Sequence, residues 1–251
     1  MFRKLIPSLL VLALALTPFA AFAETTFDGS VVAGEAVSVT APFGGTVAAP
    51  VPTVPAPEDK HEAFVVASDV TYTACGWDRR LLGEPYGGTW LLASRILSYD
   101  FLWTEVRVKG GAYGAGFQTT RSGSSRFYSY RDPRIDETVE RFRTAGDWLA
   151  GVFSPTESEM DGYVVSTVAS LDAPAKAREL LRRQDGLYFS GATLADRARV
   201  REEVRAARTE DVRALAPSVD AIAGAGCVCA FGNGEVIRAS GEDFNVVDLL
   251  A

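Results

Sequence analysis

The residues best suited to bind a polar ligand lie close together in the run RVKGGAY. Arg107 is followed by a glycine pair, Gly110 and Gly111, and then by Tyr113. A guanidinium and a phenol can both donate hydrogen bonds to a peptide carbonyl, and to the charge that develops on its oxygen. Glycines let the backbone turn sharply and come close to a ligand. This spacing therefore indicates a substrate-binding segment.

Structural roles for the same side chains remain open. Arg107 could form an ion pair with Asp100 or Glu105 near the end of its helix, and the tyrosine could simply pack on a strand. Further along the chain, Arg131 and Asp132 could pair to close a hairpin.

No catalytic or metal-binding arrangement stands out. The sequence contains a single histidine, His61. It contains no HxxEH, HExxH or GxSxG motif and no phosphate-binding loop. A zinc site with two histidine ligands cannot be built from one histidine. His61 lies beside a proline-rich segment, which is a poor place for a rigid catalytic base. We therefore expect a surface histidine, no catalytic residue and no bound cofactor in this chain.

The three cysteines are Cys75, Cys227 and Cys229. An odd number leaves at least one thiol unpaired in an exported protein. The last two are two positions apart in an apolar strand, so both should point to the same face. A bridge from Cys75 to one of them and buried free thiols are both open alternatives.

Periodicity predicts the elements that position these residues. We expect a strand over residues 62–77 with a bulge at Ser68-Asp69, a buried helix over 89–106, a hairpin of 112–120 with 126–130, and an amphipathic helix over 136–150. Thr156 and Glu159 fit a capping box that begins further helices to about residue 216. Residues 227–231 and 235–238 should form a last hairpin around Gly232-Asn233-Gly234. This order predicts an α+β fold, a two-layer domain in which a mostly antiparallel sheet packs against several helices.

The N-terminus has the pattern of a secretory signal peptide. Arg3 and Lys4 precede a short apolar run, and Ala21-Phe22-Ala23 offers a small-x-small cleavage site. Cleavage would remove two basic and no acidic residues, changing the formal net charge from −7 to −9. An acidic protein is poorly suited to bind nucleic acid. We expect export to the periplasm or outside the cell, and no membrane span after cleavage.

The domain organisation follows from composition. Residues 1–23 are the expected signal peptide, and residues 24–60 are an expected linker or tether rich in proline and alanine. The folded module is expected over residues 61–241, followed by a C-terminal tail over 242–251.

Three segments carry a resemblance to a known family: EAFVVASDVTYTACGW, LWTEVRVKGGAYGAGF and SYRDPRIDETVERF. In this order they resemble the C-terminal, fourth module of the presequence-protease branch of the insulinase (pitrilysin) zinc metallopeptidases. The resemblance runs from about residue 62 to residue 239. It implies a long chain of four similar α+β modules that close as two halves over an unfolded peptide. The zinc-binding HxxEH motif of that family belongs to its first module.

The resemblance also implies a role for this module. In the family, an arginine and a tyrosine of the fourth module reach toward the substrate, and they match Arg107 and Tyr113. We therefore expect a non-catalytic module, inactive alone, that contributes peptide binding and chamber closure to a zinc-bearing half absent from this chain. The alternatives are a stand-alone exported peptide-binding or structural module that uses its sheet edge, and a truncated gene remnant.

Overall fold

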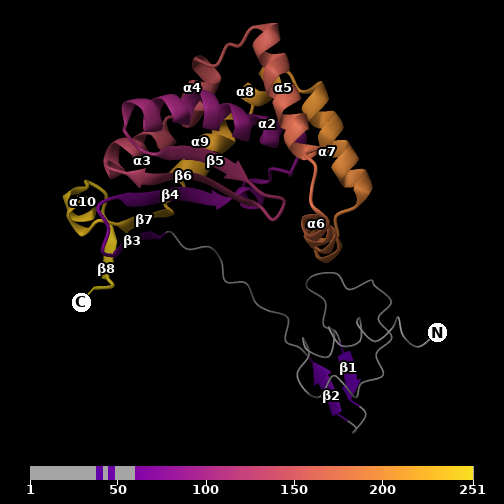
Figure 1. Ribbon diagram of the computed structural model, residues 1–251, viewed down its shortest axis with the longest axis horizontal. Helices are drawn as coiled ribbons and strands as arrows, with labels where there is room; N and C mark the ends of the chain where they lie inside the picture. The colour runs from indigo at the N-terminus through magenta and orange to yellow at the C-terminus, as the bar shows by residue number, and fades with distance from the viewer. Residues whose placement is uncertain (1–37, 42–44, 49–59, 251) are drawn as a thin grey trace. The chain divides into compact units, whose positions relative to one another are not determined.

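The computed structural model describes residues 38–41, 45–48 and 60–250 (Figure 1). β1 (Ser38–Ala41) and β2 (Gly45–Ala48) pair as a small antiparallel ribbon in a unit of their own. The expected signal peptide lies outside the described residues, as does most of the expected linker. The second unit, residues 58–251, contains the expected module.

A six-stranded sheet in the order β5-β6-β4-β7-β3-β8 forms one layer of this second unit. Its three pairings from β5 to β7 are antiparallel, whereas β3 is parallel to both of its neighbours. The strands are β3 (His61–Val65), β4 (Thr71–Asp78), β5 (Gly114–Thr119), β6 (Ser124–Asp132), β7 (Val228–Gly232) and β8 (Asn245–Asp248). The α+β prediction with a mostly antiparallel sheet is therefore confirmed.

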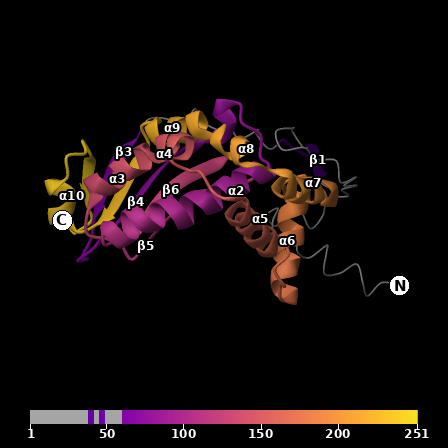
Figure 2. The same ribbon diagram turned by 90° about the horizontal axis from the view of Figure 1, so that it is seen from above.

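Helices form the second layer. Figures 1 and 2 show α2, α3, α4 and α9 against one face of the sheet, with α5, α6 and α7 gathered toward one end of it. The helical segments are η3 (Arg79–Leu82), α2 (Gly88–Ile96), η4 (Leu97–Lys109), α3 (Ile135–Arg143), α4 (Ala145–Gly151), α5 (Glu157–Leu171), α6 (Ala177–Phe189), α7 (Leu194–Ala206), α8 (Thr209–Arg213), α9 (Ala216–Gly224) and α10 (Gly234–Ala239).

A row of aromatic rings joins the two layers. The Trp90 ring of α2 lies 6.3 Å from Phe117 of β5, which lies 4.6 Å from Phe127 of β6, which in turn lies 5.3 Å from Phe142 of α3. All four side chains are at most 2% exposed. Aromatic pairs at such separations contribute about 0.5–1.5 kcal/mol beyond their buried area. This row fixes the helix layer to β5 and β6, the hairpin that follows the RVKGGAY segment.

The predicted buried helix is confirmed and is longer than expected. Residues 88–109 are continuous helix, with α2 passing directly into the π-helical η4. Its burial is one-sided, however, because Tyr99 is 58% and Trp103 40% exposed, and their rings stack 6.5 Å apart. The expectation of a helix buried all round was wrong for this outer face. The outward tryptophan becomes part of the candidate site.

The strand predicted over residues 62–77 is two strands. β3 ends at Val65 and β4 begins at Thr71, and β7 lies between them in the sheet. The turn is stabilised by Ser68, whose hydroxyl donates to Val70 O (2.8 Å) and accepts from Val70 N (3.2 Å). The strand-like composition continues through the turn. The residues around the turn therefore do not indicate that β7, from far along the chain, lies between β3 and β4.

The last predicted hairpin was also wrong. β7 is present, but the Asn233-Gly234 pair begins α10 and does not form a two-residue turn. The Asn233 side chain accepts hydrogen bonds from Glu235 N (2.9 Å) and Val236 N (3.0 Å), which is an N-cap arrangement. Residues 242–251, expected to be a tail, include β8, which pairs in parallel with β3.

Other local predictions are confirmed. The hairpin forms as β5 and β6, and Thr156 and Glu159 form the expected capping box at the start of α5. The helix predicted over residues 136–150 is interrupted at Thr144, where α3 ends and α4 begins.

The cysteines differ in environment. Cys75 is buried, and its thiol donates to Ala223 O at 3.1 Å. Burial raises the pKa of Cys75 to about 12, so the thiol stays protonated at neutral pH. Cys229 lies exposed on β7. Both are free thiols, so the bridge from Cys75 that the sequence left open is not formed.

Candidate functional site

The candidate site is built on the end of the long helix. Gly111 has a φ of 87°, and its N–H donates to Arg107 O at 3.0 Å, which is the pattern of a left-handed helix cap. Only glycine adopts this φ without strain. Gly110 is the last residue before the turn and keeps a right-handed φ of −79°. The turn sends the chain from the helix into β5, with Tyr113 at the junction.

Tyr113 lies close to two guanidinium groups. The Arg107 and Arg131 guanidinium carbons each lie 5.7 Å from the centre of the Tyr113 ring. Arg107 also stacks on the outward-facing Trp103, one helical turn earlier, at 3.8 Å from the ring centre. The Tyr113 ring packs 5.6 Å from Tyr130. Contacts of this kind orient the cations on the aromatic faces without consuming their hydrogen-bond donors.

Both arginines lack an ion-pair partner among residues 60–250. Glu105, one expected partner of Arg107, pairs instead with Lys109 (2.6 Å) and Arg141 (3.6 Å). Asp100, the other expected partner, accepts a hydrogen bond from Tyr163. The ion-pair alternative for Arg107 is therefore wrong, and its donors are available to a ligand.

The expected pair of Arg131 with Asp132 does not form either. Asp132 is fully buried and accepts hydrogen bonds from Arg134 N (2.9 Å) and Thr138 Oγ1 (2.7 Å) at the start of α3. Arg131 itself has a φ of 50°, and its carbonyl accepts a hydrogen bond from Tyr113 N at 3.2 Å. This left-handed backbone turns the Arg131 side chain toward the tyrosine.

A pocket of about 540 Å³ collects these groups. Its lining contains no acidic residue and consists of Val70, Arg107, Val108, Gly111, Ala112, Tyr113 and Arg131. Three of the four residues predicted from the sequence line it, and Gly110 lies next to them. Sequence reasoning missed Arg131 as a member of the site, because its approach to Tyr113 depends on strand pairing between β5 and β6. Trp103 was missed because the whole helix over residues 89–106 was expected to be buried.

The site offers hydrogen-bond donors and aromatic surface. Two guanidinium groups and a phenol suit carbonyl or carboxylate oxygens. The lining contains no histidine, cysteine, serine, aspartate or glutamate, and its guanidinium and phenol donors suit binding and positioning.

In the edge strand β5, the backbone groups of one residue are already occupied and cannot pair with a further strand. Phe117, in the edge strand β5, is bonded on both backbone groups by serines of the long helix. Ser94 Oγ donates to Phe117 O (2.6 Å), and Phe117 N donates to Ser98 Oγ (2.9 Å). A peptide cannot extend the sheet along β5 without displacing these bonds.

The described residues do not fit a zinc ion. No cluster of three or more histidine, cysteine, aspartate or glutamate side chains occurs in residues 60–250 that could hold a metal. His61 is a half-buried residue of β3, paired in the sheet with Val228. Across this same part of the chain, no helix has both the length and the apolar character needed to cross a membrane.

A family model described as the PreP C-terminal domain matches residues 61–230. The chain belongs to this family. The predicted resemblance to the C-terminal module of the presequence proteases is thereby confirmed. The matched segment includes Arg107, Tyr113 and Arg131.

Relatives of this chain include much longer proteins. It is 33% identical over 186 residues to Protein HypA of Clostridium perfringens, a match that covers 74% of this chain and 19% of HypA. It is 29% identical over 190 residues to presequence protease 1, chloroplastic/mitochondrial, of Arabidopsis thaliana, covering 73% of this chain and 17% of that protein. The chain thus spans about a fifth of the length of these curated relatives.

Solved structures share the fold at low identity. The peptidase M16 inactive domain from Pseudomonas fluorescens aligns with a TM-score of 0.53 at 19% identity, over 76% of this chain and 47% of that one. Pitrilysin aligns with a TM-score of 0.51 at 14% identity, over 76% of this chain and 22% of that one. These likenesses show that the chain has the fold of M16 peptidase domains.

Replacing Gly111 by alanine tests the geometry of the helix end. We expect Gly111→Ala to lower the free energy of unfolding by about 1 kcal/mol, because a Cβ disfavours a φ of 87°. The matched control is Gly151→Ala, where an added Cβ meets nothing within 4 Å and helix propensity favours alanine. Urea unfolding of both variants measures the difference. Equal stability of the two variants would contradict the left-handed cap.

Proposed function

We propose that this chain is the peptide-binding C-terminal module of a presequence-protease-type peptidase. It contributes substrate contacts and chamber closure to a zinc-bearing half that lies on another polypeptide segment. The observation that carries the proposal is that Tyr113 lies close to both Arg107 and Arg131, neither of which pairs with a carboxylate among residues 60–250.

The chemistry of an unfolded peptide matches these donors. An extended chain presents carbonyl oxygens that are not engaged in secondary structure, and a guanidinium carries five N–H donors in a fixed geometry. Trp103 and Tyr113 hold the Arg107 guanidinium in place, so less side-chain entropy is lost on binding.

An aromatic row beside the site offers contacts for the peptide's side chains. Tyr130, Tyr72 and Phe231 occupy directly paired positions on β6, β4 and β7. They are 38%, 41% and 43% exposed, and Tyr113 packs against the first of them. Exposed aromatic surface of this kind is typical of binding sites. The row therefore continues the site from the polar donors across the sheet.

Hydrolysis belongs to the absent half in this proposal. The pocket lining contains no histidine, cysteine, serine, aspartate or glutamate, and HypA and presequence protease 1, which are similar to this chain, are about four times as long. The partners are an unfolded peptide and the zinc-bearing half. At the β5 edge the sheet-edge alternative is less well supported, because the serine hydroxyls occupy the backbone of Phe117.

Substitution of the donors tests peptide binding directly. We expect Arg107→Gln and Tyr113→Phe each to weaken binding of a labelled unstructured peptide, the arginine change by about tenfold, since charge-assisted hydrogen bonds are lost. Fluorescence anisotropy of the purified chain, with chelator present, measures the affinity.

Lys109→Gln is the matched control for this experiment. Lys109 lies in the same last turn of η4, but its ammonium is already paired with Glu105 at 2.6 Å. Removing it changes the net charge as much as Arg107→Gln does. Equal weakening by Lys109→Gln would show a general charge effect and would contradict a specific site.

Export is a further part of the proposal and rests on the N-terminal sequence pattern. We expect a bacterial host with a general secretory pathway to produce a mature chain beginning at Glu24. Mass spectrometry of the protein recovered from the periplasm or medium identifies the first residue. Recovery of only the intact chain from the cytosol would contradict this expectation.

A further inference from the structure

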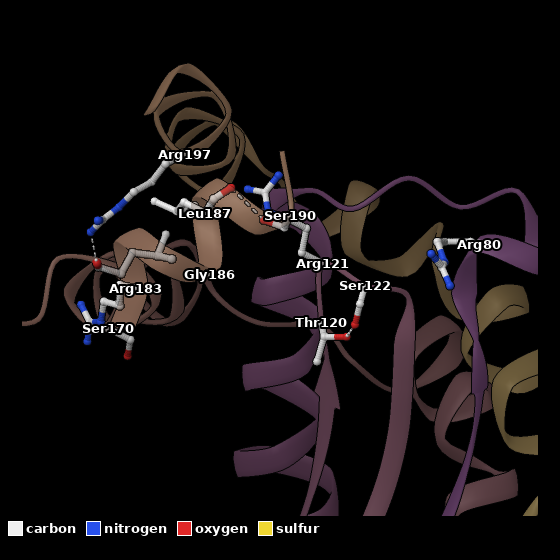
Figure 3. Close-up of a pocket in the computed structure, with 11 residues that line it drawn as sticks. Arg80, Thr120, Arg121, Ser122, Ser170, Arg183, Gly186, Leu187, Ser190 and Arg197 are labelled. Atoms are coloured by element: carbon white, nitrogen blue, oxygen red, sulfur yellow. Dashed lines mark hydrogen bonds between the residues drawn. The ribbon is translucent and has the colours of Figure 1, made fainter. Parts of the chain in front are cut away.

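A second pocket lies at the opposite end of β5 from Tyr113. It is about 710 Å³ in volume and lies between the β5–β6 turn and helices α5, α6 and α7 (Figure 3). Its lining residues are Arg80, Thr120, Arg121, Ser122, Ser170, Leu171, Arg183, Gly186, Leu187, Ser190 and Arg197. The proposed peptide site does not use any of these residues.

The lining of this pocket is rich in hydrogen-bond donors. It contains four arginines and four hydroxyl side chains but no aspartate or glutamate. The arginines come from separate elements, namely η3, the β5–β6 turn, α6 and α7. Arginines from several elements, in a lining without an acidic member, form a local positive region in a chain whose net charge is −7.

Two of the four cations are neutralised by neighbours outside the lining. Arg80 pairs with Asp78 at 2.6 Å, and Arg183 pairs with Glu179 at 2.5 Å. These pairs orient the guanidinium groups and leave some of their donors unused.

The other two cations have no carboxylate partner within residues 60–250. Arg197 donates only to Leu171 O at 2.6 Å, and Arg121 lies over the Tyr86 ring at 5.1 Å. Hydrogen bonds from Thr193, and more weakly the charge of Arg121, lower the pKa of Asp196. That carboxylate is committed to capping α7, where it accepts from Thr193 Oγ1 at 2.7 Å.

We propose that this pocket binds an oligophosphate group. Such a group carries many acceptor oxygens and several negative charges, which suit the guanidinium and hydroxyl donors of the lining. The pocket is larger than one phosphate needs, and its volume falls within the roughly 300–1,000 Å³ of small-molecule sites. Leu171 and Leu187 add apolar wall that suits the organic part of such a ligand.

An acidic peptide is the competing ligand, and the geometry favours it less. A peptide needs a groove with spaced charges, whereas these side chains surround one concave pocket and include hydroxyl donors that tetrahedral phosphate oxygens use well. The proposal goes beyond the peptide-binding function and does not depend on it.

Calorimetric titration of the purified chain with tripolyphosphate tests the proposal. We expect saturable binding with one site per chain, weakening as salt is raised. Arg121→Gln and Arg197→Gln should each weaken it by about tenfold, since each removes an uncommitted guanidinium. The two residues lie on different elements, so a folding defect in one variant leaves the other informative. Circular dichroism of each variant verifies folding.

Matched controls remove equal charge outside the pocket. Arg126 lies on the same hairpin as Arg121 and donates to Gln118 at 2.7 Å, and Arg205 lies on the same helix as Arg197 and pairs with Glu202 at 3.1 Å. Arg126→Gln and Arg205→Gln should change the affinity by less than about twofold.

Three results would overturn the proposal. One is the absence of saturable tripolyphosphate binding. Another is equal weakening by the pocket variants and the controls, which would indicate a diffuse charge effect. The third is tighter binding of an oligoglutamate peptide than of tripolyphosphate, with the same dependence on Arg121 and Arg197, which would assign the pocket to acidic polypeptide.

Discussion

The packing of Phe117 and Phe127 between sheet and helices is the constraint on which the module depends. Phe127 stacks on Phe142 of α3, and Phe117 packs on Trp90 of α2. Both phenylalanines lie on the two strands whose ends carry Tyr113 and Arg131. Serine hydroxyls of the long helix bond the backbone of Phe117, so helix and strand are held together by apolar and polar contacts at the same position. The helix end and the strand start are thereby fixed relative to each other, which is what a binding site of few residues requires.

Local patterns predicted the parts of this fold that are stabilised locally. The long helix, the β5–β6 hairpin and the Thr156 capping box follow from periodicity and end signals in neighbouring residues. The strand order could not be predicted in this way, because β7 comes from the end of the chain and separates β3 from β4. Asn233-Gly234 shows a related ambiguity. An asparagine serves equally as a turn residue and as a helix cap, and the packing of Ile237 into the core selects the cap.

The candidate site, too, could be predicted only in part from the sequence. Arg107, Gly111 and Tyr113 are close in sequence, and the family resemblance singled out Arg107 and Tyr113. Arg131 enters the site only through the pairing of β6 with β5 and through an unusual left-handed backbone. Trp103 belongs to a helix whose composition indicates burial, and its partial exposure is visible only once the sheet covers the other side. The pocket proposed to bind oligophosphate is lined by residues of η3, the β5–β6 turn and helices α5, α6 and α7. No local sequence pattern therefore predicts it.

Site-resolved photo-crosslinking tests the central claim, peptide binding at the end of the long helix, most directly. A benzophenone-bearing unstructured peptide is irradiated with the purified chain, and the attachment points are read by mass spectrometry. Our account predicts adducts on Trp103, Tyr113 and Tyr130 or their immediate neighbours, suppressed by unlabelled peptide. Adducts confined to the β8 edge, or spread over the surface and unaffected by competition, would contradict it.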